Sequence, residues 1–160
     1  DYETVNPIAL EPPIAPHIAA AQVGRELCAD DLTAHCRTVT DRDIDFVLIE
    51  GAGGWLVPIN HTETLADVCV KLHASVILVV GMKIGCLNHA LLTAAAIEHA
   101  GLKLAGWIAN SATKVEFDLD ENVATLRTRL RAPCLGVVPH LVSAGPLSAQ
   151  SFLDIDPLFP

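Results

Sequence analysis

A glutamate followed by a glycine-rich turn is the residue pattern with the clearest chemical use in this sequence. Glu50 directly follows the apolar run Phe46–Ile49 and precedes Gly-Ala-Gly-Gly at 51–54. Mg²⁺ is usually held by one or two protein carboxylates together with phosphate oxygens and water, and glycines let the main chain approach an anion closely. The pattern predicts a site for Mg²⁺ and phosphate. A glutamate that merely ends a strand at a glycine turn is the structural alternative.

Three further turns carry polar groups that could bind a ligand. The run 81–89 joins an apolar run to a helical stretch, and helix N-termini attract anions, although the sequence alone favours Asn88 as simply the N-cap of that helix. Asn110 follows the next apolar run, and its amide can match the paired donor and acceptor on an adenine edge, unless it is only a turn residue. The segment 139–141 occupies the same position after the last run.

The cysteines and histidines do not predict a metal or disulfide site. Five cysteines are an odd number, and no C-x-x-C pair occurs, which favours reduced thiols in the cytosol. Cys86 has no assignable base and is expected to be a small core residue. Four of the seven histidines lie outside the candidate ligand-binding turns and show no metal-ligand spacing. They are His35, His61, His73 and His99.

Continuous apolar runs and helical stretches alternate along the chain and must position these turns. The runs lack polar alternation, so we expect strands buried on both faces of a parallel sheet. They are Phe46–Ile49, Val76–Val80, Leu104–Ala109 and Leu135–Val138. The predicted helices are Glu63 to about Leu72, Asn88–Ala100 with Gly101 after its end, and Leu119 to about Leu130. The fold predicted is α/β, a doubly wound, mostly parallel sheet with helices on both faces, in a single domain spanning 1–160. Ligands in such folds bind at the carboxyl ends of the strands.

The first part of the chain predicts a loop and two helices. Four prolines in Tyr2–Pro16 predict an extended loop, after which Pro16 starts a helix to about Gln22 that Gly24 ends. A second helix is expected from Asp30 or Asp31 to about Val39. The chain opens with Asp1 in a turn-rich stretch, and we expect the start of a longer protein, including its first strands, to be absent.

Composition narrows the classes of partner. The 160 residues are 51% hydrophobic and carry a net charge of −9, which excludes intrinsic disorder and disfavours nucleic acid and anionic membrane surfaces as partners. No apolar stretch approaches the roughly 18 residues of a membrane span, and no signal peptide opens the chain. We therefore expect a cytoplasmic protein.

Several phrases, taken together and in order, resemble those of dethiobiotin synthetases across nearly the whole chain. They are Val5-Asn6-Pro7, Glu11-Pro12, Pro16-His17, Glu50-Gly-Ala-Gly-Gly-Trp55, Ile77-Leu-Val-Val-Gly81, Gly85-Cys-Leu-Asn-His89 and Leu104-Ala-Gly-Trp-Ile-Ala-Asn110. The resemblance implies a P-loop NTPase-like, three-layer fold. It also implies an ATP- and Mg²⁺-dependent cyclo-ligase that forms carbon–nitrogen bonds, converting 7,8-diaminononanoate and CO₂ into dethiobiotin, ADP and phosphate in biotin biosynthesis.

The resemblance also implies roles for individual residues. Glu50 would bind Mg²⁺, and the nucleotide would be bound by Glu50, Gly51, Ala52, Gly53, Asn110, Ser111, Pro139, His140 and Leu141. The distal carboxylate of the substrate would lie at Gly85, Cys86, Leu87 and Asn88, across the two-fold interface of a homodimer. The partners implied are diaminononanoate, CO₂ or bicarbonate, and ATP.

One family motif does not occur in these 160 residues. The resemblance leads one to expect G-x-x-x-x-G-K-[ST] followed by a further lysine and an aspartate, so the catalytic lysines are expected upstream of Asp1 and the segment alone is expected to be inactive. Two alternatives stay open. One is a non-catalytic binding module, or half of a split complex, that has lost the phosphate loop. The other is a related phosphate-loop synthetase or ATPase.

Overall fold

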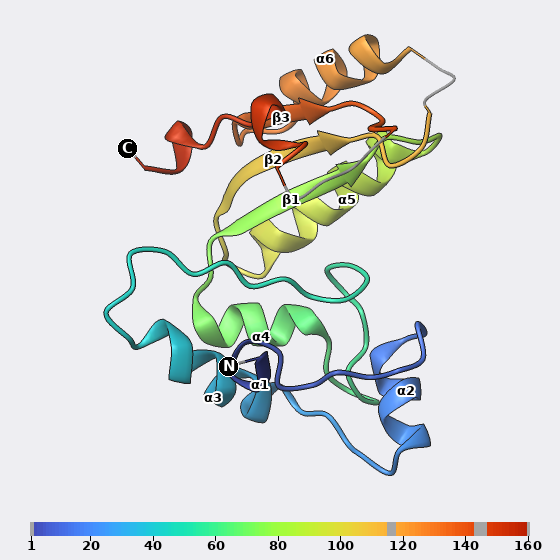
Figure 1. Ribbon diagram of the computed structural model, residues 1–160. Coiled ribbons are helices and arrows are strands. Elements are labelled where there is room, and N and C mark those ends of the chain that lie inside the picture. Colours follow the sequence, from blue (N-terminus) through green and yellow to red (C-terminus); the bar gives the residue numbers. More distant parts are fainter. Residues whose placement is uncertain (1, 115–117, 143–146, 160) are drawn as a thin grey trace. The chain divides into compact units, whose positions relative to one another are not determined.

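The computed structural model, drawn in Figure 1, describes residues 2–114, 118–142 and 147–159. The chain divides into two units, 1–74 and 75–160, and each has a hydrophobic core of its own. The expectation of one domain over 1–160 stays a prediction. Most of the helices and strands of the two units were predicted from the residue pattern.

Three parallel strands form the sheet of the second unit. They are β1 (Val76–Gly81), β2 (Leu104–Asn110) and β3 (Cys134–Val138), in the order β1-β2-β3. All three were predicted from apolar runs without polar alternation, and the α/β class with a parallel sheet is confirmed. Gly81 pairs with Asn110, and Asn110 pairs with Val138, so the strands end level with one another.

Two helices cover one face of this sheet. Helix α5 (Cys86–His99) and helix α6 (Leu119–Arg129) pack against each other and share one core with the strands. Trp107, which is fully buried, belongs to that core together with Ala90 and Leu126. Gly101 follows α5 in the left-handed conformation, with φ of +77°, as the expected C-terminal glycine should. The crossovers between parallel strands are therefore helical, as predicted.

A short return of the chain lies against β3. The 3₁₀ turns η1 (Gln150–Phe152) and η2 (Asp156–Leu158) follow the sheet, and Leu153 forms an isolated antiparallel bridge with Gly136. The Asp154 N–H donates to the Leu135 carbonyl at 2.7 Å. This segment satisfies part of the hydrogen-bonding edge of β3.

The first unit consists of helices packed on one small core. Its helices are α1 (Tyr2–Val5), α2 (Pro16–Gln22), α3 (Ala29–Thr40) and α4 (Leu65–Leu72). Pro16 stands at the first helical position of α2 and Gly24 follows with φ of +67°, as predicted. The core joins α2, α3 and α4 to the loop before α4. Its buried members are Ala20, Leu27, Ala29, Ile59 and Val68.

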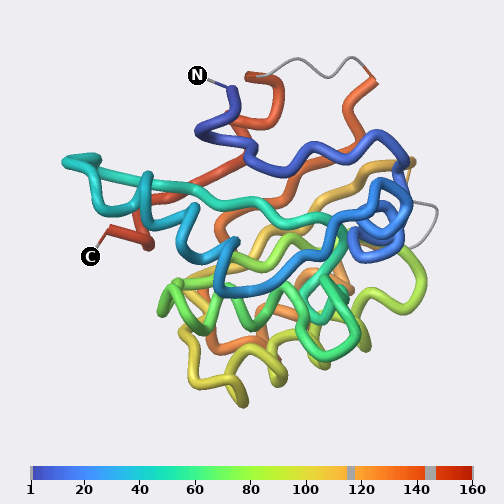
Figure 2. Tube along the Cα trace, turned by 90° about the horizontal axis from the view of Figure 1, so that it is seen from below, coloured from blue at the N-terminus to red at the C-terminus, as the bar shows by residue number. Residues whose placement is uncertain are grey.

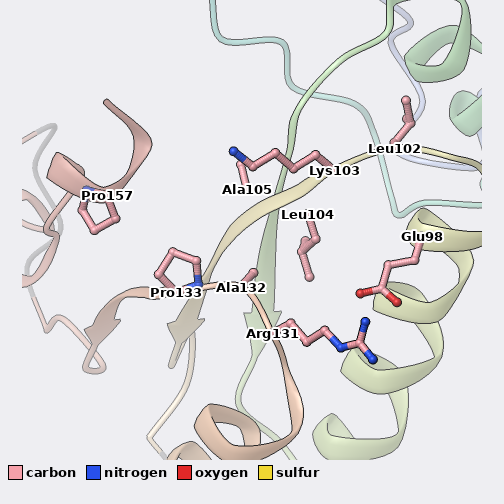
Figure 3. A pocket seen from close by; sticks show the side chains of 9 residues that line it. All are labelled: Glu98, Leu102, Lys103, Leu104, Ala105, Arg131, Ala132, Pro133 and Pro157. Atoms are coloured by element: carbon pink, nitrogen blue, oxygen red, sulfur yellow. The ribbon is translucent and has the colours of Figure 1, made fainter. Parts of the chain in front are cut away.

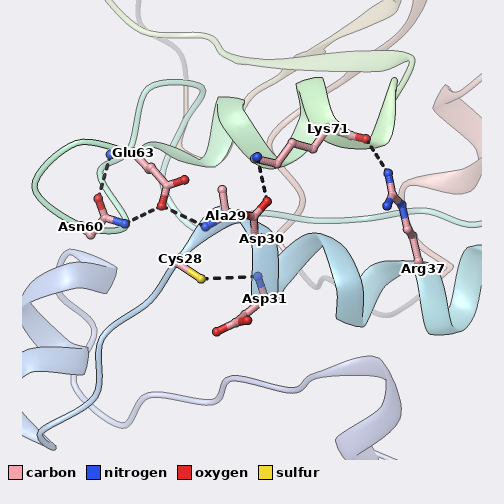
Figure 4. Close-up of polar contacts among 8 residues, drawn as sticks. All are labelled: Cys28, Ala29, Asp30, Asp31, Arg37, Asn60, Glu63 and Lys71. Carbon is pink, nitrogen blue, oxygen red and sulfur yellow. Dashed lines mark hydrogen bonds and ion pairs between the residues drawn. The ribbon is translucent and has the colours of Figure 1, made fainter.

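A polar network ties the start of α3 to the loop that precedes α4 (Figure 4). Glu63 Oε2 accepts hydrogen bonds from the Ala29 N–H at 3.1 Å and from Asn60 Nδ2 at 2.7 Å. Asn60 Nδ2 also donates to the Leu27 carbonyl at 2.9 Å. The Glu63 carboxylate thus lies at the N-terminus of α3, where the helix dipole favours negative charge.

The run Phe46–Ile49 was predicted to be a strand, and that prediction is wrong. Figure 1 shows no strand arrow there, and Figure 2 shows the chain near residue 50 as an extended trace without helical coils. Leu48 is 72% exposed and Phe46 is 52% exposed. A strand exists through its ladder with a neighbour, and apolar composition alone does not supply one. The structure forms no β-strand over residues 46–49.

A second difference lies at the start of the chain. Tyr2–Pro16 was predicted to be an extended loop, but Tyr2–Val5 forms the single turn α1 before the loop begins. The Asn6 N–H donates to the Tyr2 carbonyl at 2.8 Å, and Asn6 Nδ2 donates to the Tyr2 hydroxyl at 2.6 Å. The first proline is Pro7, so proline restricts only the residues after this turn.

The helices and the cysteines of the described residues bear on two further expectations. None of the helices there is long and apolar enough to cross a bilayer. All five cysteines are free thiols, and Cys86 is buried, as expected for a core residue.

Candidate functional site

The carboxyl ends of the three strands bring Asn110 and Ser111 next to the chain after β1 and β3. The Met82 N–H donates to the Asn110 carbonyl at 2.9 Å, and the Ser111 N–H donates to the Val138 carbonyl, also at 2.9 Å. These bonds continue the ladder one residue beyond the strands. They hold Asn110 and Ser111 at the edge of the sheet where ligands of parallel α/β folds bind.

The segment after β3 is fastened to the same edge. Nδ1 of His140 lies 3.2 Å from the Ala112 carbonyl oxygen, and because a carbonyl only accepts, Nδ1 carries the proton. Pro139 and Leu141 are half-buried on either side of the exposed His140. Asn110, Ser111 and Pro139–Leu141, five of the nine residues predicted to bind the nucleotide, are thus brought together in the second unit.

Ser111 differs from the other residues predicted to bind the nucleotide because its side chain is buried. Only 3% of Ser111 is exposed, and among the described residues its hydroxyl has no hydrogen-bond partner. A buried polar atom without a partner costs about 1–3 kcal/mol, unless a ligand or water supplies the missing bond. The hydroxyl is therefore an unused donor and acceptor beside the predicted adenine site.

The predicted carboxylate site lies at the start of α5. Gly85 precedes the helix with φ of +90°, a conformation that glycine adopts without strain. Gly85 is the N-cap, so the suggestion that Asn88 caps the helix is wrong: Asn88 lies in the first turn, where its side chain is exposed. Cys86 is buried, and the first-turn amides of Leu87 and Asn88 have no acceptor within the helix by its geometry.

Glu50 and its glycine turn belong to the first unit. Glu50, Gly51, Ala52 and Gly53 are exposed, and Gly53 has φ of +92°. Among the described residues, Glu50 has no hydrogen-bond or ion-pair partner. The carboxylate is thus free to bind a cation. Glu50 falls in a different unit from Asn110.

The donor set around Glu50 suits Mg²⁺ only when a phosphate supplies the other ligands. No group of three or more histidine, cysteine, aspartate or glutamate side chains that could hold a metal occurs within 2–114, 118–142 and 147–159. Mg²⁺ commonly takes one or two carboxylates and completes its octahedron with phosphate oxygens and water. A single unpaired carboxylate beside exposed glycines fits that mode of binding and does not fit a cage made by the protein alone.

A cavity of about 350 Å³ opens at the opposite edge of the sheet. It lies where β2 and β3 begin, and Figure 3 shows Glu98 and Arg131 on one side of it and Pro133 and Pro157 on the other. Within the second unit, Asn110, Ser111 and Pro139–Leu141 lie at the carboxyl ends of the strands, whereas this cavity lies at the amino ends. The cavity is therefore separate from these five residues.

Three groups of the first unit, Cys36, Cys69 and Lys71, have raised pKa values. A hydrogen bond to Asp30 raises the pKa of Lys71; the two groups form an exposed ion pair at 2.8 Å. Burial raises the pKa of the Cys36 thiol. Burial also raises the pKa of Cys69, and charge on the neighbouring Cys36 raises it further. These thiols stay protonated at neutral pH and are poor nucleophiles.

Comparison with known proteins decides the family. A family model described as "AAA domain" matches residues 1–147. The chain is 54% identical over 157 residues to an ATP-dependent dethiobiotin synthetase of Cellvibrio japonicus, covering 98% of this chain and 68% of that protein. The chain belongs to the dethiobiotin synthetase family. The family resemblance drawn from the strand-end phrases is therefore confirmed, and the phosphate-loop NTPase-like class of the fold is confirmed with it.

Other members of the dethiobiotin synthetase family match in the same way. The enzyme of Pseudomonas paraeruginosa is 52% identical, with 98% of this chain and 69% of that protein covered. The enzyme of Marinobacter nauticus is 46% identical over 162 residues, with the same coverage. Both are named ATP-dependent dethiobiotin synthetases. The chain spans about two thirds of the length of these relatives.

Sequence reasoning missed two long-range contacts of the loop that follows the Glu50 turn. His17 and Pro58 are 41 residues apart and joined by a hydrogen bond, while Glu63 links the loop before α4 to α3. No local spacing signals a contact between such distant residues. The phrase Pro16-His17 contributed only to the family resemblance.

Proposed function

We propose that this protein is an ATP- and Mg²⁺-dependent dethiobiotin synthetase of biotin biosynthesis, which closes the ureido ring of dethiobiotin from 7,8-diaminononanoate and CO₂. The supporting observation is the 54% identity to a dethiobiotin synthetase over 98% of the chain. The structure adds support, because the residues proposed to read adenine meet at the carboxyl edge of a parallel sheet.

The nucleotide residues have separate tasks in this proposal. The Asn110 amide reads the adenine edge with one donor and one acceptor, and the orphaned Ser111 hydroxyl supplies a further polar contact beside it. Pro139 and Leu141 frame the base on both sides of His140. Within the first unit, Gly51, Ala52 and Gly53 bring main-chain N–H groups to the phosphates.

Glu50 is the residue we propose as the Mg²⁺ ligand. Its carboxylate is exposed and unpaired among the described residues, as a ligand awaiting a phosphate-bound ion should be. The bound ion would neutralise charge on the phosphates of ATP. Glu50 would fix its place relative to the glycine turn.

The start of α5 is the proposed site for the distal carboxylate of diaminononanoate. The first-turn amides at Leu87 and Asn88 and the positive end of the helix dipole favour an anion there. Two large apolar side chains nearby, Ile84 at 89% exposed and Leu92 at 62% exposed, suit burial against a second copy of the chain. We accordingly propose a homodimer with the substrate at its interface.

The reaction in this proposal joins two anions and therefore depends on electrostatics. An amine of the substrate and CO₂ form a carbamate, ATP phosphorylates the carbamate oxygen to a mixed anhydride, and the neighbouring amine attacks its carbonyl carbon. Phosphate leaves as the ring closes. Carbamate and γ-phosphate repel each other, so holding them in line and neutralising their charge are the main catalytic contributions.

Ring closure is the direct test. The full product of the gene is incubated with diaminononanoate, bicarbonate, ATP and Mg²⁺, and dethiobiotin is measured by mass spectrometry. We expect ATP-dependent product formation that requires the diamine. The 160-residue chain assayed alone is expected to be inactive, because no G-x-x-x-x-G-K-[ST] motif occurs in it.

Each outcome separates the proposal from its alternatives. Turnover by the 160 residues alone would remove the need for a phosphate loop elsewhere. Retained nucleotide binding by the full gene product without ring closure would favour a binding module. ATP hydrolysis driven by another acid or amine would favour a related synthetase.

Because all five cysteines are free thiols, we propose the reducing cytoplasm as the compartment.

A further inference from the structure

A histidine outside the predicted site is hydrogen-bonded to the far end of the Glu50 turn. Nδ1 of His17, in α2, lies 3.2 Å from the Pro58 carbonyl oxygen. The oxygen can only accept, so the His17 ring donates. No role assigned above uses His17.

The core of the first unit brings these two residues together. Ala20 lies three residues after His17 on the same side of α2, and Ile59 directly follows Pro58. Ala20 and Ile59 are each about 1% exposed and belong to the same core cluster. Because Ala20 and Ile59 are buried in the same core, His17 and Pro58 lie on adjoining parts of the first unit, and their hydrogen bond joins α2 to the end of the turn.

Contacts of Pro58 and Val57 link the end of the turn to the glycines that follow Glu50. Pro58 pairs with Thr64, and the Leu65 N–H donates to the Val57 carbonyl at 2.9 Å. Val57 in turn covers Gly53 closely: a Cβ at Gly53 would lie 2.6 Å from Val57 Cγ2. The segment 51–58 is therefore closed on one side by α4 and at its end by His17.

We propose that His17 is a positioning residue that holds the turn 51–58 in the conformation that receives the phosphates of Mg²⁺-bound ATP. The inference rests on the proposed function of Glu50 and its glycines. Glycines in that turn lose more conformational freedom on binding than other residues, so an anchor made before ATP arrives improves affinity. His17 touches neither the nucleotide nor the ion in this proposal and acts only through Pro58.

Three variants separate the hydrogen bond from the bulk of the ring. His17→Asn places an amide N–H at the same distance from the main chain as Nδ1. His17→Phe keeps a ring but removes the donor. Ile18→Ala is the matched control, because Ile18 is the next residue of α2 and is 47% exposed.

Two measurements are made on each variant of the full gene product. Millisecond hydrogen exchange followed by mass spectrometry reports the protection of the amides at 51–57, with the amides of β1 as the internal reference. Calorimetric titration with ATP in the presence of MgCl₂ reports the dissociation constant. Neither readout requires turnover.

We expect His17→Phe to speed exchange at 51–57 without changing exchange in β1, and to raise the dissociation constant about 3- to 10-fold. His17→Asn should restore both values, and Ile18→Ala should change neither. Unchanged exchange at 51–57 in His17→Phe would overturn the inference, as would faster exchange that His17→Asn fails to reverse. If the wild-type protein does not bind ATP with Mg²⁺, the proposed function fails, while the exchange data still decide whether His17 holds the turn.

Discussion

Trp107 shows at the scale of one residue how a core can contain an unused polar group. Its side chain is fully buried between β2 and the helices, and its indole N–H has no acceptor among the described residues. The unpaired donor offsets part of the stability gained by burying a large aromatic ring.

Replacing that donor should therefore be tolerated far better than removing the ring. We expect Trp107→Phe to leave the free energy of unfolding within about 1 kcal/mol of wild type. Trp107→Ala should lower it by about 3–5 kcal/mol, because it leaves a cavity in the core. Urea denaturation of both variants is the measurement. Equal losses for Phe and Ala would mean that the indole N–H has a partner such as a buried water.

Asn110 is the residue proposed to recognise adenine, and substitution by aspartate changes a single heavy atom of its side chain. Asn110→Asp replaces the amide donor by a second acceptor while keeping the size of the side chain. We expect the dissociation constant for ATP to rise about 10-fold or more, since a matched bidentate contact to a base is worth about 1–3 kcal/mol. Fluorescent ATP titration gives the value.

Asn122→Asp is the matched control for this change. Asn122 is a half-buried residue of α6 whose Nδ2 donates to the Asp118 carbonyl. ATP affinity should be unaffected by the control. Equal affinities of wild type and Asn110→Asp would remove Asn110 from the adenine site.

Glycines decide how closely the elements of the second unit approach one another. A Cβ on Gly136 of β3 would collide with the Phe152 carbonyl oxygen and lie 2.9 Å from Leu153 Cδ2. The return segment can therefore lie on β3 only because residue 136 has no side chain. A Cβ on Gly81 of β1, by contrast, would meet no atom within 4 Å.

Alanine at these two glycines gives a matched test of how closely the return segment packs on β3. Gly136→Ala should displace η1 from β3 and lower the free energy of unfolding by about 1–3 kcal/mol, the usual range for overpacking. Gly81→Ala should leave it unchanged within about 0.5 kcal/mol. Thermal melts of both variants, with hydrogen exchange at 150–154, measure the two effects. A stable Gly136→Ala with a protected 150–154 segment would contradict this packing.

Alkaline pH should lower the free energy of unfolding through two thiols of the first unit, Cys69 and Cys36. Burial raises the pKa of Cys69 above its ordinary value of 9.0, and the neighbouring Cys36 raises it further. The unfolded chain therefore loses its thiol proton at lower pH than the folded chain does. The free energy of unfolding is then highest below about pH 9 and falls as the pH rises through the folded pKa.

This dependence can be separated from the growing self-repulsion of a chain with net charge −9. Cys69→Ala should flatten the fall of the unfolding free energy between pH 8 and about pH 10.5, because the raised pKa is removed. Val68→Ala, also in α4, should lower stability at every pH and keep the wild-type slope. Urea titrations across this range test it, and an unchanged slope in Cys69→Ala would assign the fall to net charge.

The amino-acid sequence by itself determined those elements whose signals are local. Pro16 and Gly24 bound α2, Gly101 follows α5, and continuous apolar runs gave all three strands, because backbone restrictions and two-sided burial act within a few residues. It also indicated the family, through phrases that include Glu50–Gly53 and Asn110.

Only the tertiary structure decided which segments find partners. Phe46–Ile49 is as apolar as the true strands, yet a strand requires a neighbouring ladder, which composition does not report. The bond between His17 and Pro58 and the orphaned hydroxyl of Ser111 likewise arise from residues far apart in the chain. Such contacts are set by the packing of the whole core, and no local pattern contains them.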